Sequence, residues 1–219
     1  GWLAGSAALA SLTGCGPDLV YLPETDFDMD KFLSDVKAVY EKTGKCMVAV
    51  SEGIHYADGS FVSEAKTSAT DGFGHAQLGG LASLLAQVVK EKTGAKVRGI
   101  ELSLLQRCGA HLASETDIEE AVMSGKAAVE NAVNGITDKM VGFERNYEDG
   151  QYVCKTKLLP LTDVANTEKK VPIEWINAAH NGVEKPFIDY VLPLIQGEPK
   201  LPKEDSLPRF AKLKKVLVK

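Results

Sequence analysis

The sequence predicts an α/β fold in which helices alternate with the strands of a mostly parallel sheet. Several segments carry apolar residues at helical spacing, and short apolar runs that suit buried strands lie between them. Parallel strands need long crossover connections, which are usually helices, so this alternation indicates a layered α/β domain. A β-hairpin and an extended tail are predicted to follow near the C-terminus.

The first segments predict two helices and a strand. Residues 1–10 are apolar from the first position and lack the positive charge of a signal peptide, so we expect a buried helix that begins upstream. Apolar residues recur at helical spacing over 29–40, and Gly44 suits the end of that helix. The apolar run 46–51 predicts a buried strand.

A polar stretch separates this strand from the next helix. Residues 52–75 contain several glycines, which predicts a long loop, and such loops are often functional. The glycine-rich segment 72–80 suits either an anion at a helix N-terminus or a closely packed helix start. Leucines over 78–85 predict a helix that ends near Gly94, and the apolar centre of 96–104 predicts a further strand.

The pattern changes in the last part of the chain. Residues 116–119 have the Thr-x-x-Glu spacing of a capping box, which predicts a helix that runs to Gly135. Strand-like segments at 140–144 and 152–158 flank Asp149-Gly150, a pair typical of a tight hairpin turn. The prolines that follow predict short helices and an extended tail, with no strong break in the chain before about residue 160.

Composition excludes several classes of protein. The 219 residues carry a net charge of -5, whereas nucleic-acid-binding domains usually have a strong basic excess. No apolar run approaches the roughly 20 residues that a membrane helix needs. The four cysteines form no CxxC pair, and the histidines do not pair with them at zinc spacing, so we expect reduced, mostly buried thiols in a cytosolic protein.

Residues that follow the predicted strands are the first candidates for a site, because ligands bind beyond the carboxyl ends of parallel strands. Glu52 follows the run 46–51 and precedes a glycine and the long loop. A carboxylate there can accept hydrogen bonds from the hydroxyls of a sugar, although a helix-capping or ion-paired glutamate would show the same pattern.

Two arginines bracket the strand predicted at 96–104. The chain has four arginines against 21 lysines, and a guanidinium group binds phosphate or carboxylate bidentately. Arg107 lies at the end of the run, where a site is expected, whereas Arg98 lies near its beginning and would more easily serve a neighbouring subunit. A surface salt bridge is the alternative for both. His111 and His180 have no nucleophile or carboxylate at a recognisable spacing, so no catalytic residue is assigned.

Several of these segments together resemble the C-terminal half of the 6-phosphofructokinases. The matching residues are Val48-Ala49-Val50-Ser51-Glu52-Gly53, Arg98, Leu104-Leu105-Gln106-Arg107-Cys108 and Asp117. Gly1-Trp2-Leu3-Ala4 is similar to the helix after that family's Met-Gly-Arg motif, and Leu22-Pro23-Glu24 to its next strand end. Residues 101–108 are most similar to bacterial enzymes of the pyrophosphate-using branch.

The resemblance implies a three-layer sandwich that binds fructose 6-phosphate. It implies that Glu52 contacts the sugar hydroxyls, that Arg107 contacts the 6-phosphate, and that Arg98 reaches over from an adjacent subunit of a homo-oligomer, either a dimer or a tetramer. Leu104 departs from the His or Tyr that many relatives carry at the phosphate, and leucine cannot donate a hydrogen bond.

The resemblance also implies that the phosphoryl-donor loop, the catalytic base and the Met-Gly-Arg motif precede Gly1. We therefore expect a cytoplasmic, glycolytic enzyme in which 1–165 is the substrate-binding domain and 166–219 packs on an N-terminal domain. Residues outside this chain would bind Mg²⁺ and the donor, pyrophosphate or ATP, and the chain alone would be inactive. The alternative is a non-enzymatic α/β module that binds a small anionic ligand.

Overall fold

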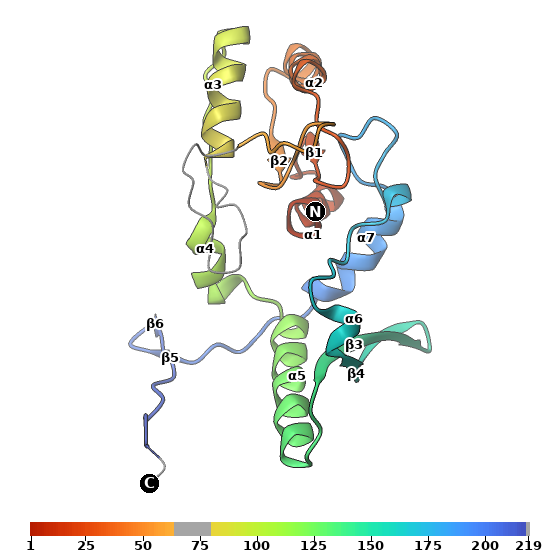
Figure 1. Cartoon of the computed structure of the whole chain (residues 1–219). Helices are drawn as coiled ribbons and strands as arrows, with labels where there is room; N and C mark the ends of the chain where they lie inside the picture. The colour runs from red at the N-terminus through yellow and green to blue at the C-terminus, as the bar shows by residue number, and fades with distance from the viewer. Residues whose placement is uncertain (64–79, 218–219) are drawn as a thin grey trace. The chain divides into compact units, whose positions relative to one another are not determined.

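The computed structural model describes residues 1–63 and 80–217 (Figure 1). Contacts divide the chain into two compact units: a first unit, Gly1–Leu102 with Thr167–Leu192, and a second unit, Ser103–Asn166 with Pro193–Lys219. The units are therefore interleaved along the sequence. The expected division at residue 165 stays a prediction, because it concerns packing on a further domain.

The elements follow one another as α1 (Trp2–Ser6), η1 (Ala7–Thr13), β1 (Leu19–Tyr21), α2 (Met29–Thr43), β2 (Val48–Val50), α3 (Leu81–Thr93), α4 (Ser103–Cys108), η2 (Ala110–Leu112), α5 (Glu115–Val133), β3 (Lys139–Glu148), β4 (Gln151–Pro160), α6 (Leu161–Val164), η3 (Ile173–Trp175), α7 (Lys185–Val191), η4 (Leu192–Ile195), β5 (Lys203–Glu204) and β6 (Leu207–Pro208), where η marks a 3-10 helix. No helix among the described residues is long and apolar enough to span a membrane.

The first unit is built around the parallel pair of β1 and β2, in which Leu19 lies beside Val48 and Tyr21 beside Val50. Successive side chains of a strand point to opposite faces, so the two faces of β1 enter two different apolar clusters. Helices α2 and α3 contribute to the first cluster, and η1 and α7 to the second. The predicted α/β fold with parallel strands is therefore confirmed, with helices on both faces of the pair.

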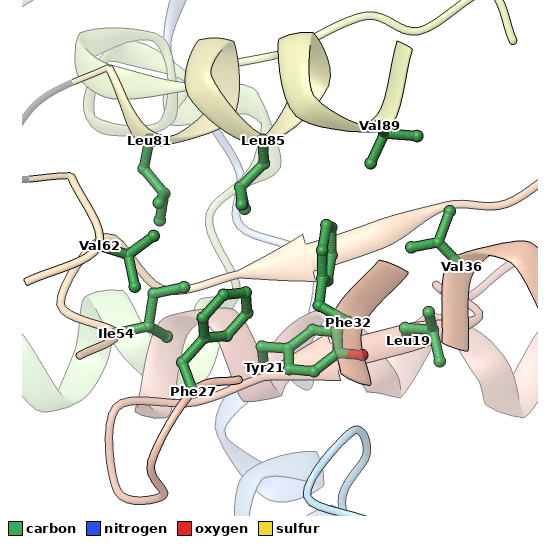
Figure 2. Close-up of a cluster of buried hydrophobic side chains, with 10 residues drawn as sticks. All are labelled: Leu19, Tyr21, Phe27, Phe32, Val36, Ile54, Val62, Leu81, Leu85 and Val89. Atoms are coloured by element: carbon green, nitrogen blue, oxygen red, sulfur yellow. The ribbon is translucent and has the colours of Figure 1, made fainter. Parts of the chain in front are cut away.

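The first cluster joins α2 and α3 to the strands (Figure 2). Leucines at positions 81 and 85 and a valine at 89 share one face of α3 and point toward α2 and β1 in Figure 2. Its buried members are Leu19, Tyr21, Phe27, Phe32, Val36, Ile54, Val62, Leu81, Leu85 and Val89. Burial of each large side chain contributes about 1.5–3 kcal/mol to folding, so this cluster supplies much of the stability of the first unit.

The second cluster lies on the other face of β1. Phe187 of α7 is completely buried, and Gly5 of α1 packs so closely on its ring that an added Cβ would lie 2.5 Å from Cζ. Trp2 stacks on the same ring, with the two centroids 5.7 Å apart. The buried members are Ala8, Leu9, Val20, Leu22, Val171, Ile176, Phe187 and Val191.

Helices α2 and α5 begin with side-chain caps, one at the predicted position and one not. The predicted helix at 29–40 is confirmed as α2, in which Asp28 accepts a hydrogen bond from the Lys31 N–H (2.8 Å) and Gly44 takes the left-handed conformation (φ 72°). The cap predicted at residues 116–119 is wrong. Ser114 caps α5 instead, because its extended backbone precedes the first turn and its Oγ accepts from the Asp117 N–H (3.1 Å).

The strand predicted at 96–104 is also wrong. The chain from 95 to 102 forms no strand, and α4 begins at Ser103. A short apolar run suits a strand or a helix, and an extended segment becomes a strand only beside a partner with free backbone groups. Within the described residues β1 and β2 pair with each other alone. Gly99 instead packs on α3, where an added Cβ would lie 2.5 Å from the Ala82 carbonyl oxygen.

The second unit contains the predicted hairpin, which β3 and β4 form with ten paired positions. Asp149 (φ 52°) and Gly150 (φ 77°) both have positive φ, as a type I′ turn requires. No described residue of this unit is buried, and even large apolar side chains are exposed. Val129 on α5 leaves 65% of its surface exposed, and Leu213 in the tail leaves 90%. The contacts within this unit therefore do not amount to a hydrophobic core.

Candidate functional site

Glu52 lies in a tight turn at the carboxyl end of β2. The Ser51 N–H donates to the Tyr21 carbonyl (3.1 Å), which continues the parallel ladder past the strand, and the Ile54 N–H closes the turn on the Ser51 carbonyl (3.3 Å). Ile54 is completely buried, whereas Glu52 is exposed. Buried neighbours therefore fix the backbone of the turn while the carboxylate faces solvent, as a ligand-binding group requires.

The segment after β1 lies beside this turn. Gly53 lies against Pro23, since an added Cβ would lie 3.7 Å from the Pro23 Cβ. The Phe27 N–H donates to the His55 carbonyl (2.8 Å), and the His55 Nδ1 lies 3.9 Å from an Asp26 oxygen. These contacts place polar groups of both strand ends next to one another. Asp26 and His55 were not among the predicted site residues, although each follows a predicted or matched strand end by a few residues.

A hydrogen-bond network links β1 to α2 within the same unit. One oxygen of Asp35, Oδ2, accepts from Lys31 Nζ (2.6 Å), the Tyr21 hydroxyl (2.9 Å) and Asn181 Nδ2 (2.9 Å). Although burial opposes it, these hydrogen bonds lower the pKa of Asp35. Burial, together with the hydrogen bond to Asp35, raises the pKa of Tyr21. The network therefore holds an ionised Asp35 and a neutral Tyr21.

Arg98 lies on the extended segment after α3, and its neighbours fix the backbone there. Val97 packs on the first cluster, and Gly99 packs on the first turn of α3. The Arg98 side chain is exposed and forms no ion pair with any other residue that the structure describes. The alternative of a surface salt bridge has no partner in that part of the chain.

Arg107 lies in the last turn of α4, in the second unit, and not at the end of a strand as expected. Its side chain is exposed and pairs with no described carboxylate. No hydrogen bond or ion pair among the described residues joins any two of Glu52, Arg98 and Arg107. The roles of these three residues therefore stay predictions.

The weaker candidates have simple structural positions. His111 lies in η2, and His180 (φ 54°) closes a turn on the Asn177 carbonyl. Apart from Gly80, the glycine-rich segment 72–80 lies outside the described residues. All four cysteines are free, but the expectation that they are mostly buried is wrong, since Cys15 and Cys108 are exposed and Cys46 and Cys154 half-buried.

Known proteins match the whole chain. A family model described as phosphofructokinase matches residues 1–132. The chain is 44% identical to a pyrophosphate--fructose 6-phosphate 1-phosphotransferase of Xanthomonas campestris pv. campestris, over 100% of the chain and 52% of the relative. A relative of the same name from Halomonas elongata is 41% identical, over 98% of the chain and 51% of the relative. The crystal structure of a pyrophosphate-dependent phosphofructokinase from Nitrosospira multiformis matches with a TM-score of 0.82 and 36% identity, over 100% of the chain and 50% of that structure. The chain thus spans about half the length of the relatives it matches.

Proposed function

This chain belongs to the phosphofructokinase family, and from that membership we propose that it is the fructose 6-phosphate-binding half of a 6-phosphofructokinase. The complete enzyme would transfer a phosphoryl group to the 1-hydroxyl of fructose 6-phosphate, as a cytoplasmic step of glycolysis. Pyrophosphate or ATP would be the donor, and the printed names of the relatives favour pyrophosphate.

The observation that carries this proposal is the turn that presents Glu52. A carboxylate has two acceptor oxygens and can hold two hydroxyls of a sugar at once. The ladder bond at Ser51 and the buried Ile54 fix the turn before any ligand binds, so little conformational entropy would be lost on binding.

Arg107 would donate to the 6-phosphate, and Arg98 would reach the site of an adjacent subunit in a dimer or tetramer. Phosphate suits a guanidinium group, which offers two parallel N–H donors in a fixed plane. Neither side chain is tied to a described carboxylate, so each is available to a ligand.

The donor side of the reaction is proposed to lie outside this chain. Phosphoryl transfer by this family needs Mg²⁺, a bound donor and a base at the attacking hydroxyl. That the Mg²⁺ ligands lie outside this chain follows from the family resemblance alone. The second unit, none of whose described residues is buried, would be completed by the rest of the protein, and the chain alone would be inactive.

The test is a pair of glutamate variants in the complete enzyme. We expect Glu52→Gln to raise the KM for fructose 6-phosphate at least about tenfold, because hydrogen bonds to a charged acceptor are worth about 1.5–3 kcal/mol. The KM for the donor should hardly change. Glu41→Gln is the matched control, since Glu41 is exposed on α2 and forms only a surface ion pair. Equal KM values for fructose 6-phosphate in the two variants would contradict the proposal.

A further inference from the structure

Glu24 is a buried acidic residue to which the proposed reaction gives no role. It lies three residues beyond the end of β1, and only 6% of its side chain is exposed. A carboxylate removed from water is costly unless hydrogen-bond donors compensate for the lost hydration. The donors of Glu24 therefore indicate what the residue does.

Two segments far apart in the sequence contact one oxygen of Glu24, the first through a backbone hydrogen bond and the second through the terminal amino group. The Val171 N–H lies 3.0 Å from Oε1, and the Gly1 nitrogen lies 3.2 Å from the same atom. A Cβ on residue 1 would collide with the carboxylate, so glycine is the residue that allows this close approach.

A second set of contacts holds the same returning segment. Trp2 Nε1 donates to the Lys169 carbonyl (2.7 Å), and Lys169 Nζ donates to the Tyr190 hydroxyl (2.8 Å). The ammonium group also lies 5.0 Å from the centre of the Tyr190 ring and 5.6 Å from that of Trp2. Residues 169–171 are thus fastened to the beginning of α1 by Trp2 and to the end of β1 by Glu24.

The Glu24 contacts continue directly into the turn of Glu52, because Pro23, the neighbour of Glu24, lies against Gly53. We propose that Glu24 is a positioning residue that fixes the beginning of α1 and the returning chain at Val171 against the strand end beside Glu52. A shift of this anchor would move Pro23 and, through it, the turn that presents the carboxylate. Only the link to substrate binding rests on the proposed function; the anchor itself does not.

The test uses two variants of Glu24 in the complete enzyme. Glu24→Ala removes the acceptor, so we expect amide hydrogen exchange at Val171 to accelerate at least about tenfold, the loss expected for one hydrogen bond to a charged group. The KM for fructose 6-phosphate should rise at least about threefold while kcat changes less, because the shift acts on substrate binding. Oε2 has no hydrogen-bond partner among the described residues, so Glu24→Gln can keep the Oε1 acceptor and should restore both values to within about twofold of the wild type.

Glu41→Ala, which removes an exposed carboxylate of the same unit, is the control. The anchor is overturned if Val171 exchanges equally fast in Glu24→Ala and in the control. The positioning role is overturned if exchange accelerates but the KM stays at the control value, or if Glu24→Gln fails to restore the KM. If Glu24→Ala does not fold, Glu24→Gln is the remaining test. The proposal then requires that Val171 exchange and the KM for fructose 6-phosphate in Glu24→Gln lie within about twofold of the wild-type values. If the wild type does not use fructose 6-phosphate, the proposed function fails, and the exchange rate at Val171 still decides on the anchor.

Discussion

Replacement of Asp35 by alanine should destabilise the first unit by about 2–4 kcal/mol. The buried Tyr21 hydroxyl would lose its acceptor, which costs about 1–3 kcal/mol. The Asn181 amide would lose a hydrogen bond to a charged group, and the exposed Lys31 pair would add less than about 1 kcal/mol. These terms act through one oxygen, so they are not additive and the total lies below their sum.

Urea unfolding of the complete protein measures this loss. Trp2 and Trp175, the two tryptophans of this chain, both lie in the first unit, so their emission reports on that unit once any tryptophan outside the chain has been replaced. Tyr21→Phe in the Asp35→Ala background should cost less than in the wild type, since the hydroxyl then has no acceptor to lose. The control Glu41→Ala should stay within about 0.5 kcal/mol of the wild type.

The pH dependence of the free-energy difference between wild type and Asp35→Ala is a second readout. The folded-state pKa of Asp35 is below its unfolded value of about 3.9, so its stabilisation is fully present above that pH. It is lost as the pH falls through the folded-state pKa. The free-energy difference between wild type and Asp35→Ala should therefore shrink below about pH 4. The reasoning would be refuted if Asp35→Ala lost no more unfolding free energy at pH 7 than Glu41→Ala does. It would also be refuted if the difference between wild type and Asp35→Ala grew as the pH fell below about 4.

Three further predictions concern the ligand groups and the core. Arg107→Ala should weaken fructose 6-phosphate binding by about 1.5–3 kcal/mol and leave the donor KM unchanged; an unchanged substrate KM would count against its role. Mixed subunits carrying Arg98→Ala and Glu52→Gln should recover activity that neither variant has alone, because one intact site forms in each mixed pair; no recovery would place Arg98 in its own subunit's site or outside any site. Leu85→Ala should lower the free energy of unfolding by about 2–5 kcal/mol, since Leu85 is 5% exposed within the first cluster; a loss below 1 kcal/mol in urea unfolding would contradict the packing described.

Local signals allowed the helices and the hairpin to be predicted. Gly44 and Gly94 end their helices in the left-handed conformation, and Asp149-Gly150 forms the predicted turn, because the preferences of these residues act over a few positions. The strand at 96–104 was not predictable in this way, since strand formation depends on a partner elsewhere in the chain.

The missed residues share one physical cause. Glu24 stands 147 positions from Val171, and nothing near it in the sequence indicates that its carboxylate is buried. Asn181 reaches Asp35 from 146 positions away. Both interactions exist because the chain returns to the first unit after residue 166. The residues that surround Glu24 and Asp35 in the sequence do not indicate this return.

Because of that return, truncations within the C-terminal quarter of the chain differ in their effect according to where they fall. A stop codon after residue 166 would remove more than a tail, because Val171, Phe187 and Val191 belong to the second cluster of the first unit. The lesion would therefore strike the first unit, although most of that unit's sequence lies before residue 103. A stop codon after residue 192 would leave that cluster whole and delete only residues of the second unit. Two nonsense alleles separated by 26 codons should thus differ in kind: the first yields protein that is degraded, the second protein that retains a folded first unit.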